Sequence, residues 1–289
     1  MRGGAKKGWR WRVEDRAAND DLGLLYEPGN WGDVLKGVWA VRVATALAAS
    51  RPGERFVYLD PFAGAPTYPL VEASRSRLEA APPSPFVDLQ RPYAARGRLA
   101  STALLVRDAV AAAGGDVLLR VFDADPKRLE AWKALEGTEA AEGPSGEAVL
   151  AGAAEAGGSP PDLVLVDPYD LFLRWKDLVP PAARAARRSA AILYLYNKAP
   201  RGPGQARLYA DFRSELAREL RAAGGRALLG RVPADATVAR AYHEVVLLGP
   251  ATEIPDLEEV LARDARDLAE AIARRGAFEV LEASEGLGA

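Results

Sequence analysis

The tetrapeptide Asp167, Pro168, Tyr169, Asp170 combines side chains that can hold and orient an amino group for reaction. The lone pair of an exocyclic amine on an aromatic base is delocalised into the ring. A reaction at that nitrogen therefore needs acceptors for its protons and a surface that fixes its orientation. Asp167 could supply a carboxylate, Pro168 a main-chain carbonyl and Tyr169 a stacking face, so we predict these three residues as catalytic. The alternative is that Asp167 merely ends a strand while Asp170 caps the next helix.

Asp60 precedes a turn, residues 61–66, that could bind a ligand without phosphate groups. Gly64 lets the backbone pass close to a ligand, but the turn lacks the G-x-G-x-x-G pattern that holds a dinucleotide pyrophosphate. This difference disfavours a nicotinamide enzyme. S-adenosylmethionine needs only a close backbone approach and a polar anchor, and it is the cofactor that we predict. The alternative is a turn that begins a helix and binds nothing.

A further acidic pair, Asp123 and Asp125, precedes Pro126. Asp125 is explained as a helix N-cap, because Asp caps helices and Pro suits the first helical position. Asp123 is then left without a structural role and can accept hydrogen bonds from ribose hydroxyls. The alternative for Asp123 is a solvated loop acid.

The elements that would position these acids alternate between apolar segments typical of strands and amphipathic segments typical of helices. Strands are predicted at 55–60, 117–123, 138–141, 162–167, 190–196, 226–232 and 242–248, and helices at 30–49, 99–113, from 126, from 171, at 209–223 and at 257–275. This order predicts an α/β fold with a Rossmann-like, doubly wound, mostly parallel sheet and an antiparallel strand near the C-terminal end. Ligands bind beyond the carboxyl ends of such strands, so Asp60, Asp123 and Asp167 should converge in one crevice.

The 289 residues fit an N-terminal arm followed by one domain. Residues 1–25 interleave Arg and Lys with Trp, which could hold phosphates and stack on bases, or could be a solvated terminus. Residues 26–289 are predicted to form a single domain. It includes a helical insertion at about 68–98, because this connection is too long for a simple crossover.

Composition restricts the function further. The formal net charge is −2, so a nucleic-acid site must be local, and a loop with Lys198, Arg201 and Arg207 could hold RNA phosphates or be solvated. Cys is absent and the single His, His243, lies in an apolar alternation, so we predict no disulfide and no metal site. No apolar segment is long enough for a bilayer, and residues 1–12 lack a signal-peptide pattern. We therefore expect no membrane partner and a cytoplasmic location.

Three segments resemble motifs of the RlmJ family, which methylates adenine N6 in large-subunit ribosomal RNA. Residues 29–36 (GNWGDVLK) resemble its G-N-x-x-D-V-L-K, residues 58–65 (YLDPFAGA) resemble its Y-L-D-x-H-A-G-A, and residues 167–169 (DPY) lie where it carries D-P-P-Y. The similar segments span residues 26–170 in the same order. The resemblance implies a class I methyltransferase fold, S-adenosylmethionine as the cofactor, and ribosomal RNA as the substrate, and hence RNA binding and a part in rRNA processing.

The resemblance also implies roles for single residues. The candidate cofactor-binding residues are Asn30, Lys36, Asp60, Phe62, Gly64, Ser101, Asp123, Ser145, Gly146 and Asp167. Lys36 and Phe62 would border the methionine moiety, Ser101 would line the pocket and Asp123 would hold the ribose. Ser145 and Gly146 would flank the adenine, and Asp167 would be the catalytic acceptor. From the residues alone, Lys36 could be a solvated helix residue, and Ser145 with Gly146 a plain turn.

The chain also departs from the family pattern. Gly37 and Phe62 stand where the family has His, Pro66 replaces its second Gly, and the missing Pro in DPY shifts Tyr169 by one position. An Asp-Pro-aromatic ending before a Trp-bearing helix is also similar to the three-Cys-motif partner proteins. Two alternatives therefore stay open: a protein that binds RNA or cofactor without methylating adenine, and a methyltransferase with another target atom. The sequence leaves the oligomeric state undetermined.

Overall fold

The computed structural model describes residues 28–141, 143–155, 159–168, 171–198, 203–223, 226–234, 241–273 and 281–282. The N-terminal arm, Tyr169, Asp170 and Arg201 lie outside these residues, so what was predicted for them stays a prediction.

The core of the fold is one mixed sheet. Its strands, in spatial order, are β10 (Leu281–Glu282), β8 (Ala227–Pro233), β9 (Ala241–Leu248), β7 (Ala190–Lys198), β6 (Leu163–Val166), β1 (Arg55–Asp60), β4 (Asp116–Val121) and β5 (Thr138–Ala140). Strands β5, β4, β1, β6 and β7 are parallel, and β9 is antiparallel to both of its neighbours, β7 and β8. The predicted doubly wound α/β sheet is confirmed, and this order with β9 reversed is that of the class I methyltransferase fold.

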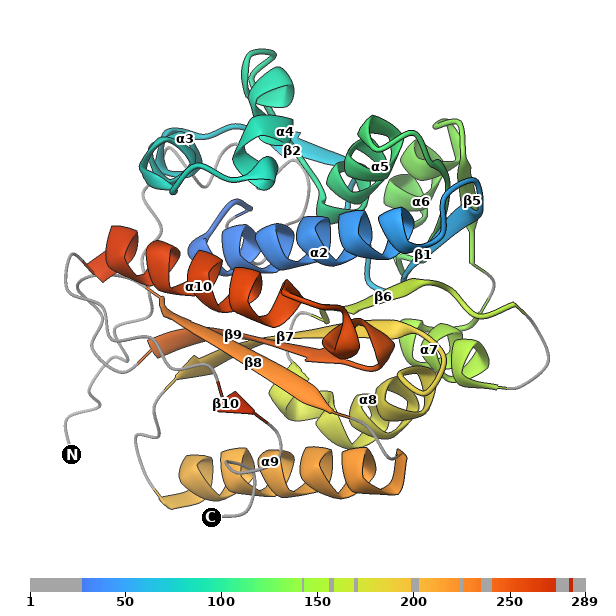
Figure 1. The fold of residues 1–289 in the computed structure, drawn as a ribbon, viewed down its shortest axis with the longest axis vertical. Coiled ribbons are helices and arrows are strands. Elements are labelled where there is room, and N and C mark those ends of the chain that lie inside the picture. Colours follow the sequence, from blue (N-terminus) through green and yellow to red (C-terminus); the bar gives the residue numbers. More distant parts are fainter. Residues whose placement is uncertain are drawn as a thin grey trace, which may run out of the picture.

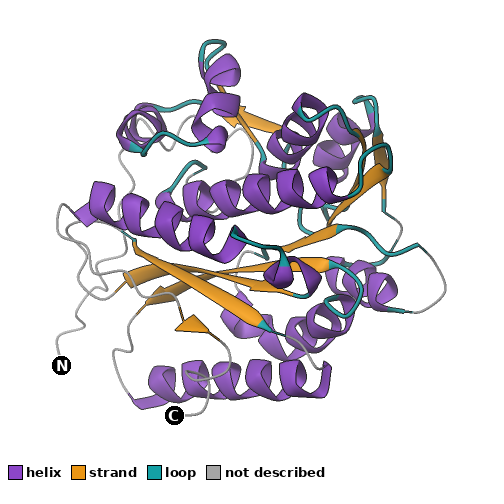
Figure 2. Cartoon of the chain, viewed as in Figure 1, coloured by secondary structure: helices purple, strands orange, loops and turns teal. Residues whose placement is uncertain are grey.

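Helices cover both faces of the sheet (Figures 1 and 2). On one face lie α2 (Trp31–Ser50), α5 (Thr102–Ala112) and α10 (Leu257–Ala273), and on the other lie α7 (Gly146–Ala154), α8 (Leu171–Ala185) and α9 (Pro203–Ala223). A shorter helix, α6 (Pro126–Lys133), connects β4 to β5, and a 3-10 helix, η1 (Pro250–Glu253), follows β9. The four residues of β6 are all buried, as expected for a central strand covered on both faces.

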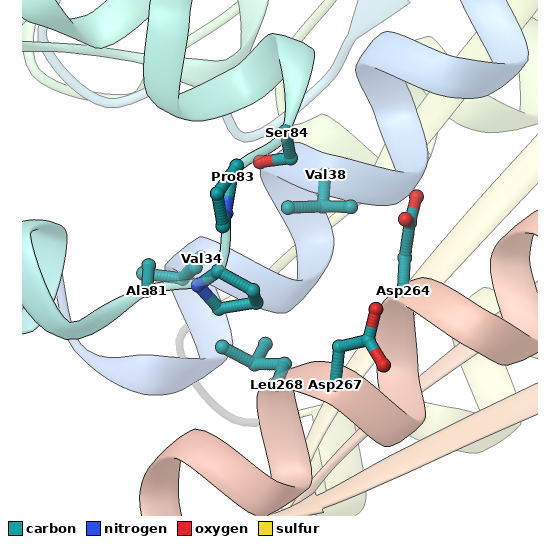
Figure 3. A pocket seen from close by; sticks show the side chains of 9 residues that line it. Val34, Val38, Ala81, Pro83, Ser84, Asp264, Asp267 and Leu268 are labelled. Atoms are coloured by element: carbon teal, nitrogen blue, oxygen red, sulfur yellow. The ribbon is translucent and has the colours of Figure 1, made fainter.

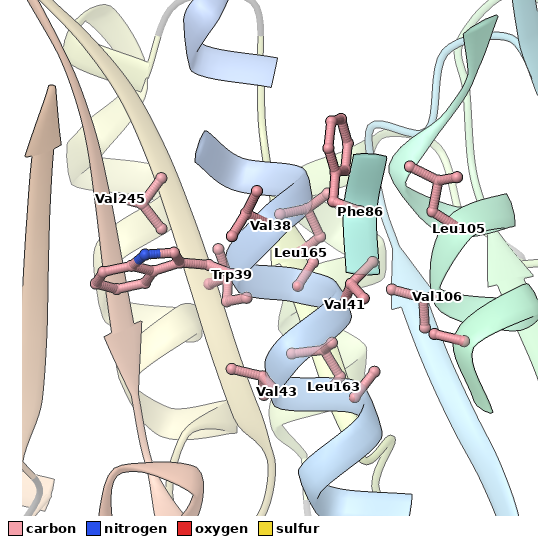
Figure 4. Packing of buried hydrophobic residues seen from close by; sticks show 14 of the residues in the cluster. Val38, Trp39, Val41, Val43, Phe86, Leu105, Val106, Leu163, Leu165 and Val245 are labelled. Atoms are coloured by element: carbon pink, nitrogen blue, oxygen red, sulfur yellow. The ribbon is translucent and has the colours of Figure 1, made fainter. Parts of the chain in front are cut away.

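Helix α2 is the central element of the core on its face of the sheet. Its N-cap is Asn30, as predicted: the Oδ1 atom accepts hydrogen bonds from the backbone N–H of Gly32 at 2.7 Å and of Asp33 at 3.1 Å. Figure 4 shows Val38 and Trp39 pointing from α2 into the packed cluster. The Trp39 side chain is fully buried. The helix is therefore held firmly against the sheet that it crosses.

Between β1 and α5 the chain forms a small unit of its own. Strands β2 (Thr67–Pro69) and β3 (Arg98–Ala100) pair antiparallel and enclose α3 (Glu72–Ala80) and α4 (Pro85–Ala94). The predicted helix over 99–113 was wrong at its start, because Leu99 pairs with Tyr68 in this two-stranded sheet. Helix α5 begins only after Ser101. Pairing with a distant segment overrode the local helical pattern.

Two other parts of the chain differ from their predictions. Ser145 and Gly146 do not form a plain turn, because Ser145 is the N-cap of α7 and Gly146 is its first residue. The predicted basic loop around Arg207 was also wrong: Pro203 begins α9, a position that suits Pro, and Arg207 lies exposed within this helix. None of the described helices has both the length and the apolar character required to span a membrane.

Candidate functional site

Three acidic residues lie where parallel strands end at one edge of the sheet. Strand β1 pairs with β4 on one side and with β6 on the other, and Asp60 is level with Val121 of β4. Asp123 comes two residues after β4 and Asp167 directly after β6. The order along this edge is therefore Asp123, Asp60, Asp167. The structure brings these three predicted residues to the same edge, as the parallel topology requires.

Lys36 of α2 forms an ion pair with Asp167. The ammonium Nζ donates a hydrogen bond to an Asp167 carboxylate oxygen and a second one, of 2.9 Å, to Asp33 Oδ1. The Lys36 side chain is only 8% exposed, so the alternative of a solvated helix residue is wrong. Burial alone would lower the pKa of Lys36, but the nearby carboxylates of Asp167 and Asp33 outweigh it and raise the pKa well above its ordinary value. Lys36 is therefore a buried cation at the edge of the sheet.

Asp60 is a buried carboxyl group at the centre of this edge. Its Oδ1 accepts a hydrogen bond of 3.0 Å from the backbone N–H of Phe62, and its Oδ2 accepts one of 3.2 Å from the hydroxyl of Tyr58. Burial raises the pKa of Asp60 to about 7, and the charge of Asp167 acts in the same direction while Lys36 opposes it. Burial likewise raises the pKa of Asp167, against the influence of the Lys36 ammonium. The site can therefore hold or release a proton near neutral pH.

Asp123 fixes the loop that follows β1. Its Oδ2 accepts a hydrogen bond of 2.9 Å from the backbone N–H of Gly64, and its Oδ1 accepts one of 2.8 Å from that of Asp125. Gly64 has a φ of 63°, in the left-handed region, and its carbonyl accepts a 2.9 Å hydrogen bond from Trp132 Nε1. The prediction that Asp123 has no structural role was therefore wrong. Each carboxylate oxygen has a second lone pair, so the residue can hold the loop and still accept hydrogen bonds from a ligand.

The other predicted residues adjoin the same loop or position it. A Cβ atom on Gly146 would lie 2.3 Å from the ring of Phe62, so the first turn of α7 packs directly on the loop. The backbone N–H of Ser101 donates a 2.9 Å hydrogen bond to the Pro66 carbonyl, at the end of the loop. The side chains of Ser101 and Ser145 both serve as helix N-caps. Pro168 is buried beside Asp167, and Asn30 acts through the helix that carries Lys36.

Three polar residues of this region were not predicted as site residues: Asp33, Tyr194 and His243. The Tyr194 hydroxyl and His243 Nδ1 are hydrogen-bonded at 2.8 Å, and the Lys36 ammonium lies 5.2 Å from the centre of the Tyr194 ring. Asp33 has a sequence signal, because it lies three residues before Lys36 on one helix. Tyr194 and His243 have none, because they meet only through the pairing of β7 with β9.

A small pocket lies elsewhere, between α2, α10 and the 81–84 turn (Figure 3). Val34 and Val38 of α2 line it, and Lys36, two residues from each, projects from the other side of the helix. The pocket contains none of the predicted site residues. Among the described residues there is also no group of three or more His, Asp or Glu side chains placed to hold a metal ion.

No family model and no curated protein matches this chain in sequence. Among solved structures, the chain is similar to protein LPL1258 from Legionella pneumophila, of the family DUF519. The TM-score is 0.62 at 12% identity, over 89% of this chain and 99% of that chain. The similarity supports the same overall fold.

Two further structures match weakly. The mitomycin 7-O-methyltransferase MmcR has a TM-score of 0.32 at 15% identity, covering 73% of this chain and 53% of its own. A putative methyltransferase from Thermoplasma acidophilum has a TM-score of 0.31 at 14% identity, covering 69% of each chain.

Proposed function

We propose that this protein is an S-adenosylmethionine-dependent methyltransferase that acts on a nucleic-acid base, with the N6 amino group of an adenine in ribosomal RNA as its target. One observation carries the proposal: Asp60, Asp123 and Asp167 meet at the carboxyl edge of a sheet with the class I methyltransferase strand order. This edge is where open α/β sheets bind their ligands.

The residues at this edge fit a cofactor that is cationic and has no phosphate. Asp123 and Asp60 lie on either side of the loop that contains Gly64, and their carboxylates would repel a pyrophosphate but attract a sulfonium and an ammonium group. The Asp123 carboxylate also lies 3.6 Å from the Arg128 guanidinium. In this assignment Asp123 accepts further hydrogen bonds from the ribose hydroxyls. Phe62 and Gly146, which pack together, border the cofactor from the side of α7. The bound cofactor supplies an electrophilic methyl group.

The contribution of Asp167 is to hold the amine that receives the methyl group. A carboxylate next to the amine accepts one of its protons in a hydrogen bond and fixes the nitrogen lone pair in the required direction. We propose the Pro168 carbonyl as the partner of the other proton and Tyr169 as the partner of the ring. The reaction releases a proton as the amine is methylated. Asp60 ends the strand next to the one that Asp167 follows and has a pKa of about 7, so it is the group that we propose to accept this proton.

The finer target, an adenine in ribosomal RNA, rests on the resemblance to the RlmJ family and on the Asp-Pro-Tyr sequence. The test is to incubate purified protein with methyl-labelled S-adenosylmethionine and unmodified ribosomal RNA, and to identify labelled nucleosides by mass spectrometry. We expect N6-methyladenosine. Asp167→Asn should lower the rate by about 100-fold or more. The matched control Asp116→Asn, at the opposite edge of the sheet and largely exposed, should retain the wild-type rate.

A second function is favoured by the ion pair between Lys36 and Asp167, which occupies one acceptor oxygen of the proposed catalytic carboxylate. The protein would then bind cofactor or RNA without methylating adenine, or would methylate another atom. Cofactor binding by calorimetry without labelled product on RNA or DNA would support the first of these. A labelled nucleoside other than N6-methyladenosine would support the second. A wild-type rate for Asp167→Asn would refute Asp167 as the acceptor.

A further inference from the structure

Three aromatic rings form a row on the face of the sheet that α2 covers. We call Tyr194, His243 and Tyr196 the aromatic row. The ring centres of Tyr194 and His243 are 6.0 Å apart with an interplanar angle of 22°, and those of His243 and Tyr196 are 5.1 Å apart with an angle of 32°. The alternation of side chains along β7 places Tyr194 and Tyr196 on the same face, and His243 of β9 lies directly opposite Tyr196.

The row begins beside the proposed catalytic carboxylate. Strand β7 is the neighbour of β6, and Val166 of β6 is level with Leu193 of β7. Asp167 is therefore level with Tyr194, and Tyr196 lies two residues, about 7 Å, further out along the strand. Asp123 lies on the other side of Asp167, two strands away. Asp167 therefore divides the carboxyl edge of the sheet into two halves. We assign the half next to Asp123 to the cofactor, and the other half lies next to Tyr196.

The inner members of the row are rigidly held, whereas the outer one is exposed. His243 is 5% exposed, and burial lowers the pKa of its ring to about 4, so the imidazole is uncharged at neutral pH. The first turn of α2 clamps the pair, because a Cβ on Gly32 would lie 2.1 Å from the Tyr194 hydroxyl. Tyr196 is 37% exposed, and among the described residues it is the one large hydrophobic side chain that is exposed.

We propose that Tyr196 is a second stacking surface for the target base, in addition to Tyr169. The base leaves the RNA strand and lies between the Tyr196 ring and Asp167. This inference rests on the proposed function, since it concerns the substrate side of the same site. An exposed aromatic ring with a fixed ring behind it is the arrangement that binds unstacked bases of single-stranded RNA, because every base has a π face. The aromatic row would hold the base next to Asp167. The other neighbours of this carboxylate, Lys36 and Asp33, are charged.

The test compares Tyr196→Ala with Tyr196→Phe, which keeps the ring. The first measurement is the Kd of a fluorescent single-stranded oligoadenylate by anisotropy, without cofactor, and the second is the Kd of S-adenosylmethionine by calorimetry. Loss of one base stack should weaken oligoadenylate binding by about 5-fold to 150-fold in Tyr196→Ala. Tyr196→Phe should bind within about twofold of wild type, since the stacking face remains. Cofactor affinity should be unchanged in both variants, and circular dichroism should show that both are folded at the assay temperature.

The inference is overturned if the wild-type protein does not bind the oligoadenylate, if Tyr196→Ala binds it as wild type does, or if Tyr196→Phe is as weak as Tyr196→Ala. Failure of the proposed function gives a different result: no cofactor binding and no methyl transfer by the wild-type protein. The anisotropy measurement requires neither cofactor binding nor methyl transfer. It therefore tests the stacking surface even if the proposed function is wrong. If methyl transfer occurs, Tyr196→Ala should raise KM for RNA by the same factor as Kd, with a smaller effect on kcat.

Discussion

Replacing Lys36 with Met tests the buried charges on which the candidate site depends. Met has nearly the volume of Lys but no charge, so the substitution leaves Asp167 and Asp33 facing each other without their cation. Removing one partner of a fully buried ion pair costs about 3–5 kcal/mol. The side chains of Asp167 and Asp33 are 22% and 23% exposed, so water relieves part of this cost. We therefore expect the free energy of unfolding to fall by about 2–4 kcal/mol at pH 8.

The assay is urea denaturation at pH 8 and at pH 5, followed by circular dichroism. At pH 5 the loss should be smaller. The cation that opposes the raised pKa of Asp167 is gone in the variant, so this carboxyl takes up a proton more readily than in wild type. The double variant with Asp167→Asn should recover at least half of the loss, because no unpaired carboxylate remains at that position. A loss below about 1 kcal/mol at pH 8, or a double variant no more stable than Lys36→Met, would refute the buried ion pair.

Two further predictions concern stability. The folded-state pKa of Asp60, about 7, exceeds its ordinary value of 3.8, so its contribution favours folding at low pH and is lost as the pH rises from about 4 to about 7. Asp60→Asn should therefore raise the free energy of unfolding by up to about 4 kcal/mol at pH 8 and by little at pH 4, and equal effects at both pH values would contradict the assignment. Gly32→Ala should cost about 1–3 kcal/mol, because the new methyl group would overlap the Tyr194 hydroxyl. The control Gly152→Ala, in α7 with open space around it, should cost nothing or gain up to about 1 kcal/mol, and thermal melts that rank the two alike would count against the close approach.

The sequence predicted the layers of this fold well, because each central strand carries its own signal. The apolar residues that precede Asp60 and Asp167 and the Asp125–Pro126 helix start are local patterns, and the structure confirms the elements that they predicted. Where a distant segment decides the conformation, the local pattern failed. The residues around Leu99 have a helical pattern, but Leu99 pairs with Tyr68 in a strand. No residue near Leu99 in the sequence indicates this pairing.

For the candidate site, too, the sequence predicted the positions that follow from local patterns but not the contacts between distant segments. The topology of a parallel sheet is enough to place Asp60, Asp123 and Asp167 at one edge, because each acid follows a strand that the sequence predicts. The topology says nothing of what surrounds them. That Asp123 ties down the loop at Gly64, or that His243 supports Tyr194, depends on contacts between residues far apart in the chain. Such contacts leave no period or motif in the sequence.

The first turn of α2 rests on side chains from β7 and β9, which the ribosome makes much later than the helix itself. Gly32 leaves the exit tunnel first, and His243 emerges 211 residues later. During synthesis, the first turn of this helix is therefore made before the side chains that pack against it. A nascent chain that stops before β9 also lacks His243, the central ring of the aromatic row. Truncated products that lack β9 should consequently fold poorly.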